Sequence, residues 1–115
     1  MLEARRYEEI EMTQGSTAQR EHPSSAFADH WAERTDLAAA FRSAARLNLH
    51  EGVANHFSVA VNRDGTQFLI NPNQSHFSRI RASELLVLDA NDPGTMDKPN
   101  APDPTAWGLH GALHR

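Results

Sequence analysis

The sequence contains no cysteine, and this absence excludes disulfide bonds, thiolate catalysis and cysteine-ligated zinc. Any metal bound by this chain would need histidine or carboxylate ligands. Long apolar runs are also missing, since the longest, residues 85–88, is far shorter than the roughly 20 residues that cross a bilayer. The N-terminus lacks the apolar core of a signal peptide. We therefore expect a cytoplasmic protein without a membrane partner.

Clusters of basic residues and glycine-rich loops are absent as well. The formal net charge is -4 and the 11 lysines and arginines are scattered, so nucleic acid is not an expected partner. The glycines are isolated from one another, which argues against a mononucleotide-binding loop. A chain of 115 residues with 39% hydrophobic residues predicts one rather polar domain with a single core.

The first 34 residues differ in composition from the rest. They hold seven acidic residues against four arginines, together with polar, turn-prone stretches. Too little apolar surface is present to offset the entropy of ordering. We therefore predict a mobile acidic leader over residues 1–34, poorly ordered up to about residue 25, and an ordered domain over residues 35–115.

The ordered part begins with a helical pattern and continues with a hairpin pattern. Apolar residues recur at helical spacing behind Thr35 and Asp36, which are candidate caps, and the helix should end at Glu51-Gly52. Residues 57–61 alternate between apolar and polar, which indicates a half-buried strand. The turn sequence at residues 62–65 predicts a hairpin, with residues 66–70 as its second strand.

The second half of the domain predicts a third strand and a last helix. Residues 71–74 should form a polar loop, and the apolar run at residues 85–89 is typical of a strand covered on both faces. A proline-rich connector over residues 90–104 then leads to a helix with Asp103 as its cap and Pro104 in its first turn. Together these elements predict a layered α/β domain.

Four polar side chains are candidates for chemistry. His110 and His114 lie four residues apart, a spacing that can present two imidazoles to zinc, but the signature lacks the glutamate of a zinc-protease helix. We therefore expect a packed or solvent-facing pair. His56 and Ser58 share one face of their strand without an orienting acid, so we expect no catalytic triad, and His56 is either a hydrogen-bonded strand histidine or a site residue.

Several segments, in this order and spacing, resemble the class II aldolase/adducin family over residues 35–115. They are Asp36-Leu-Ala-Ala-Ala-Phe-Arg42, Leu49-His-Glu-Gly-Val53, Asn55-His-Phe-Ser58, Phe68-Leu-Ile-Asn-Pro-Asn73, Ser83-Glu-Leu-Leu-Val-Leu-Asp89 and Asp103-Pro-Thr-Ala-Trp-Gly-Leu-His-Gly-Ala-Leu-His-Arg115. The resemblance implies a three-layer α/β/α sandwich with a mainly antiparallel sheet, which this chain would form incompletely. It also implies a homo-oligomer, usually a tetramer, with active sites between subunits.

The resemblance further implies a metal-dependent lyase (aldolase) acting on a small hydroxy-carbonyl or carboxylated substrate, with zinc or another divalent metal held by three histidines. The substrate-binding residues that it implies are Asn55, His56, Ser58, Asn71, Asn73 and Thr105. No catalytic residue and no metal ligand of the family is matched in this chain.

The departures from the family pattern affect the expected function. Ala106 stands in the place of the family's catalytic acid, and Gln74 in the place of a loop glycine. The family's His-x-His metal motif would lie beyond Arg115, so we expect a truncated, inactive N-terminal part of an enzyme. A non-catalytic adducin-like interaction module is the alternative, and a freestanding small α/β binding protein with only structural likeness to the family is the third reading.

Overall fold

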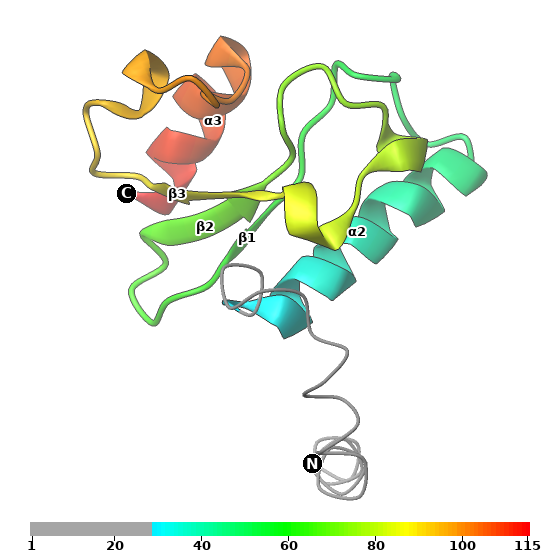
Figure 1. Cartoon of the computed structure of the whole chain (residues 1–115), viewed down its shortest axis with the longest axis horizontal. Helices are drawn as coiled ribbons and strands as arrows, with labels where there is room; N and C mark the ends of the chain where they lie inside the picture. The colour runs from blue at the N-terminus through cyan, green and yellow to red at the C-terminus, as the bar shows by residue number, and fades with distance from the viewer. Residues whose placement is uncertain (1–28) are drawn as a thin grey trace, which may run out of the picture.

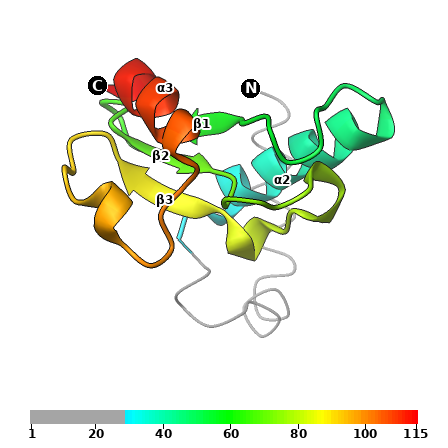
Figure 2. The same ribbon diagram turned by 90° about the horizontal axis from the view of Figure 1, so that it is seen from above.

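The computed structural model describes residues 29–115, so the predicted leader lies outside the described residues except for residues 29–34. Three antiparallel strands form a sheet of order β1-β2-β3: β1 (Ser58–Ala60), β2 (Gln67–Ile70) and β3 (Leu86–Asp89). Helix α2 (Trp31–Arg46) packs on one face and helix α3 (Pro104–His114) on the other, as Figures 1 and 2 show. The predicted three-layer α/β/α arrangement is confirmed for this part of the chain.

Helix α2 is longer at its start and shorter at its end than its sequence pattern predicts. It begins at Trp31, and the hydroxyl of Thr35 bonds within the helix, to the Trp31 and Ala32 carbonyls, so the prediction of a cap at Thr35 or Asp36 is wrong. The helix ends before Glu51-Gly52 because Asn48 turns with a φ of 57°. The backbone N–H of Leu49 then donates to the carbonyl of Ala44 and closes the helix.

The predicted hairpin is confirmed. Ser58 pairs with Ile70 and Ala60 with Phe68, so the turn spans residues 62–65. The Asn62 side chain accepts a hydrogen bond from the Gln67 backbone N–H at 3.0 Å and stabilises the turn. The register of β1 therefore fixes the position of Ser58 in the sheet, opposite Ile70 of β2.

Each face of the sheet packs against its own apolar cluster. Leu69 of β2 packs with α2 residues, including Phe41, and with two residues that are 0% exposed, Phe77 and Ile80. Phe77 begins the short 3-10 turn η2 (Phe77–Arg79), and Ile80 lies between η2 and a second short turn, η3 (Ala82–Glu84). The opposite face, towards α3, has a cluster of Phe68, Ile70, Leu88, Ala90 and Ala106.

β3 is not covered on both faces, in contrast to the prediction. Leu88 is buried on the α3 side, but Val87 on the other side is 42% exposed. β3 lies at one end of the strand order, and α2 packs across β1, β2 and the 3-10 turns instead. The apolar run therefore reflects an edge strand with one covered face.

The segment that leads to α3 follows the prediction with one addition, the short turn η4 (Thr95–Asp97). Asp103 caps α3 by accepting a hydrogen bond from the Ala106 backbone N–H at 3.1 Å, and Pro104 opens the helix, as predicted. Neither helix of residues 29–115 combines the length and the apolar character that crossing a membrane would require.

Candidate functional site

Two histidines of α3 share one hydroxyl of the sheet. The Oγ of Ser58 lies 2.7 Å from Nδ1 of His110 and 2.9 Å from Nε2 of His114. The other ring nitrogen of His114, Nδ1, lies 2.9 Å from the carbonyl oxygen of Gly65 in the hairpin turn. The helical spacing of four residues therefore places both rings on the sheet, and the histidine pair is packed rather than solvent-facing.

The partners determine the direction of these hydrogen bonds when the histidines are neutral. A carbonyl can only accept, so Nδ1 of His114 carries the proton and its Nε2 accepts from the Ser58 hydroxyl. The oxygen of Ser58 then accepts from Nδ1–H of His110. The result is one continuous chain of donors and acceptors that runs from α3 through β1 to the hairpin turn.

The surroundings of these hydrogen-bonded side chains disfavour a positive charge on His110. Burial lowers the pKa of His110, and the neighbouring His56 and His114 lower it further. The rings of His56 and His110 lie edge to face at 6.0 Å, and His114 stacks on Phe68 at 4.2 Å. His56 Nε2 in turn lies 3.5 Å from a carboxylate oxygen of Asp103, so His56 has an acidic neighbour whereas His110 has two histidine neighbours.

A second polar pair joins the segment before β1 to the segment after β2. The Nδ2 of Asn71 donates to the backbone carbonyl of Asn55 at 3.2 Å, and Asn71 is only 3% exposed. The Oδ1 of Asn71 is buried without a hydrogen-bond partner. An unsatisfied buried acceptor costs free energy until a donor reaches it, so this oxygen is a candidate ligand contact.

The six predicted substrate residues thus fall into three sets. Asn55 and Asn71 contact one another. His56 lies beside Asp103 at the start of α3, and Ser58 is hydrogen-bonded to His110 within that helix. Asn73 and Thr105 are exposed, on the loop and in the first turn of α3. The resemblance places the strand and the loop that carry Asn55, His56, Ser58, Asn71 and Asn73 beside the substrate cleft, and that these five converge at one pocket edge remains a prediction. Sequence reasoning left His110 and His114 out of this set, although their spacing of four residues was the signal that could have included them.

The described residues do not fit the family's metal. In residues 29–115 no three histidine, aspartate or glutamate side chains are grouped so that they could hold a metal ion. His110 and His114 direct one ring nitrogen each to Ser58, and the second nitrogen of His114 is bonded to Gly65. We therefore assign no metal ligand in this part of the chain.

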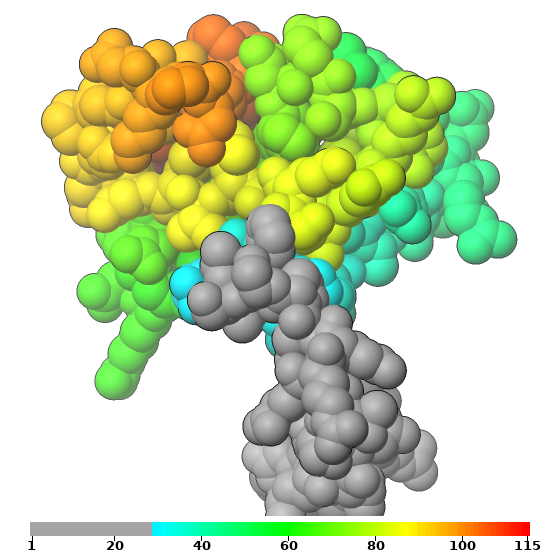
Figure 3. All heavy atoms as spheres, viewed as in Figure 1, coloured from blue at the N-terminus to red at the C-terminus, as the bar shows by residue number. Residues whose placement is uncertain are grey.

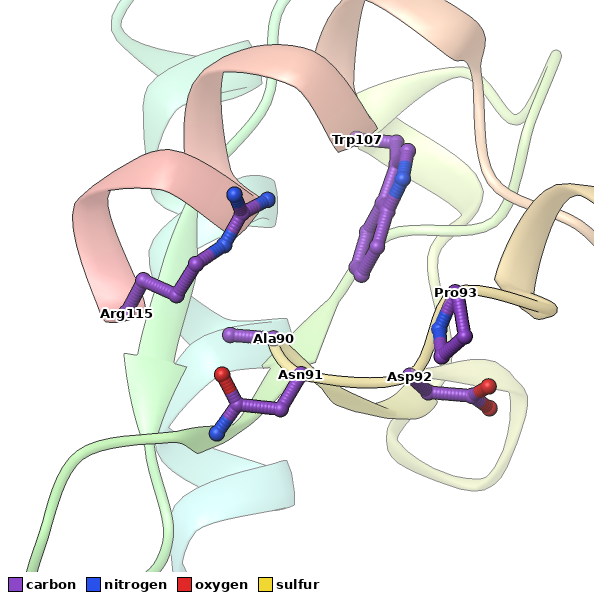
Figure 4. A pocket seen from close by; sticks show the side chains of 6 residues that line it. All are labelled: Ala90, Asn91, Asp92, Pro93, Trp107 and Arg115. Carbon is purple, nitrogen blue, oxygen red and sulfur yellow. The ribbon is translucent and has the colours of Figure 1, made fainter.

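A separate hollow of about 270 Å³ lies between α3 and the loop after β3. Figure 4 shows Trp107 and Arg115 projecting from the α3 side over Ala90 and Asn91. None of the predicted substrate residues lines this hollow. It is therefore distinct from the polar contacts of Ser58 and Asn71.

Comparison with known sequences identifies relatives of this chain. Residues 35–115 match the family described as the class II aldolase and adducin N-terminal domain. A Pseudomonas aeruginosa protein assigned by name to the class 2 aldolases is 38% identical over 88 residues, which cover 76% of this chain and 33% of that protein. An adducin-related protein of Schizosaccharomyces pombe is 33% identical over 90 residues, covering 73% of this chain and 28% of that protein. The chain thus spans about a third of the length of these relatives.

A solved structure is similar in both fold and sequence. The crystal structure of an aldolase II superfamily protein from Pseudomonas syringae superposes with a TM-score of 0.62 at 27% identity, and the match covers 85% of this chain and 38% of that one. The likeness is therefore not structural alone, which argues against the third reading of the sequence. The chain belongs to the class II aldolase and adducin N-terminal domain family.

Proposed function

We propose that this chain binds the small hydroxy-carbonyl or carboxylated substrate of a lyase of the class II aldolase type. The observation that supports this proposal best is the Asn55–Asn71 contact, with its buried and unpartnered Asn71 oxygen. Both residues lie in segments that resemble the family's substrate loops. The side-chain nitrogen of Asn71 is already bonded, so the oxygen is the acceptor that remains for a substrate hydroxyl.

Binding at Asn71 requires a small movement of the loop at residues 71–74. Asn71 is only 3% exposed without a ligand, so a substrate hydroxyl has to displace the atoms that cover its oxygen. The gain is the hydrogen bond that this oxygen lacks, which is worth about 1–3 kcal/mol for a buried polar atom. A loop outside regular secondary structure can make this movement at lower cost than a strand.

We assign substrate recognition, and not catalysis, to this chain because it has no acidic side chain at the position where the family's proton-transferring acid would stand. Ala106 occupies the place of the family's acid, is 0% exposed and packs in the cluster that includes Phe68. A methyl group cannot transfer protons. We accordingly expect no lyase turnover by this chain by itself.

A non-catalytic, adducin-like interaction module is the second candidate. The burial of Ala106 favours it, since the position of the acid has become part of the packed core. The adducin-related relative is in keeping with this second candidate. The two candidates differ in whether a small ligand reaches Asn71.

A titration followed by NMR tests the proposal on the full chain labelled with 15N. Dihydroxyacetone and glycolate serve as a neutral and a carboxylated probe. We expect saturable shifts of the Asn55 and Asn71 signals with at least one of them. Asn71→Ala should abolish these shifts, while Asn91→Ala, at an exposed position in the loop after β3, should leave them unchanged. Absence of saturable shifts with both probes would overturn the recognition role and leave the interaction module.

A further inference from the structure

A surface hollow of about 380 Å³ has no residue of β1 or α3 in its lining. Its lining includes Val53, Gln74, His76, Arg79, Arg81 and Glu84. Val53 of the loop that follows α2 lies on one side, and the segment that runs from the loop after β2 through η2 and η3 forms the other. Figure 3 shows the yellow-green segment around η2 beside the green-cyan residues that follow α2 at the surface.

Positive charge exceeds negative charge in this hollow. Two arginines line it against one carboxylate, that of Glu84. Within residues 29–115 no carboxylate lies within ion-pair distance of Arg79. The contact of Arg81 with Glu84 is loose, since Nε and Oε1 are 3.9 Å apart and the two side chains are 73% and 44% exposed. Most of the guanidinium N–H groups are therefore available to a ligand.

The third group of the hollow is also a donor. Nδ1 of His76 accepts a hydrogen bond from the Ser78 backbone N–H at 3.1 Å, so the neutral ring carries its proton on Nε2. This Nε2–H has no hydrogen-bond partner in the part of the chain that the structure describes. His76, Arg79 and Arg81 thus offer donors only, which is the pattern that suits an oxyanion.

The backbone below these donors is held at several points. Phe77 and Ile80 are both 0% exposed, whereas the nearby Arg79 and Arg81 are exposed. Nε of Arg42 donates to the Ile80 carbonyl at 3.1 Å. The Phe77 backbone N–H donates to the Gly52 carbonyl at 3.3 Å and joins the two walls. A fixed backbone reduces the entropy lost when the donors engage a ligand.

We propose that this hollow binds the oxyanion group, carboxylate or phosphate, of a small organic ligand through Arg79, Arg81 and His76. Two arginines in a chain of net charge -4 suit a small anion better than a polyanion. The site lies next in sequence to the proposed substrate loops, since Gln74 follows Asn73 and Val53 precedes Asn55 by two residues. The proposal does not depend on lyase chemistry, because it rests on separate side chains.

Titration of the full labelled chain with inorganic phosphate and with acetate, at constant ionic strength, tests the site. Backbone signals of Ser75 and His76 and the Nε–H signals of the arginines report on it. We expect saturable shifts at about millimolar concentration, as for a few charged hydrogen bonds at an open surface. Arg79→Gln and Arg81→Gln should each weaken binding by about tenfold, the effect of losing one such bond.

Two further variants serve as controls. Arg63→Gln removes an equal charge at the exposed hairpin turn and should leave anion binding unchanged, whereas Glu84→Gln removes the competing carboxylate and should tighten it. Stronger binding of phosphate than of acetate would identify a phosphate ester as the ligand class, and the reverse order a carboxylic acid. Absence of saturation with both anions, or equal loss in Arg63→Gln and Arg79→Gln, would overturn the proposal. Shifts caused by neutral dihydroxyacetone at Asn71 are a separate readout, so either proposal can fail alone.

Discussion

The hydroxyl of Ser58 lies 2.7 Å from Nδ1 of His110, although the two residues are 52 positions apart in sequence. The same hydroxyl contacts His114, so a single side chain of β1 connects two turns of α3 to the sheet. Apolar packing of α3 against the sheet has no preferred direction, whereas these hydrogen bonds require one rotation of the helix. Ser58 therefore determines how α3 is oriented on the sheet.

Replacing this hydroxyl should destabilise the domain. In Ser58→Ala both histidines lose a partner in a partly buried place, and we expect a loss of about 1–3 kcal/mol in the free energy of unfolding. Urea denaturation measures it. Ser43→Ala, at an exposed position of α2, is the matched control and should change stability by less than about 0.5 kcal/mol. Equal stability of the two variants would contradict the role given to Ser58.

Stability should fall on mild acidification because of His110. Its pKa is lowered in the folded protein by burial and by His56 and His114, so the unfolded chain binds the proton first. The contribution is fully present above about pH 6.5, the ordinary histidine value, and is lost as the pH falls from there towards the lower folded pKa. The acidic side chain in contact with this cluster is Asp103, whose carboxylate lies 3.5 Å from Nε2 of His56 and not beside His110.

The variant His110→Asn isolates this effect. It can retain an N–H donor towards Ser58 but cannot be protonated. We expect the melting temperature of the unmodified protein to drop between about pH 7.5 and pH 5.5, and to drop less in the variant, because one titrating group has been removed. Identical pH profiles of the two proteins would show that His110 does not titrate in this range.

Zinc should bind this chain only weakly. A tight zinc site generally needs at least three protein ligands, and His110 and His114 have the spacing but already share the Ser58 hydroxyl. Isothermal titration of the purified chain with zinc should show binding weaker than micromolar. Stoichiometric binding at or below about micromolar concentration that is abolished by His110→Ala would refute this prediction.

Removing the guanidinium of Arg34 should lower the free energy of unfolding by more than removing a typical surface charge does. Arg34 is 6% exposed, and its Nη1 donates to the carbonyls of Ala82 and Leu85 at 3.0 and 2.9 Å. Arg34→Met keeps most of the apolar stem but leaves both carbonyls without these donors, so we expect a loss of about 2–4 kcal/mol. Arg46→Met in the last turn of α2, an exposed site, is the control for denaturation experiments.

The local elements could be predicted because their determinants lie within a few residues of one another. The alternation of residues 57–61, the turn at residues 62–65 and the Asp103-Pro104 start of α3 all depend on backbone preferences and nearest neighbours. The family resemblance could be recognised from the same short strings, which follow one another in order. The succession of helices and strands and the family are thus encoded in local sequence, whereas the exact bounds of α2 are not.

Tertiary structure decided what those elements bring together. The start of α2 at Trp31, the exposed face of β3 at Val87 and the pairing of Asn55 with Asn71 depend on neighbours that are distant in sequence. The hydrogen-bonded chain from His110 through Ser58 to His114 depends on the rotation of α3 over the sheet. A periodic pattern specifies which face of a helix is apolar, but it does not specify the partner of each polar side chain, because that partner is set by the packing of elements about 50 residues apart.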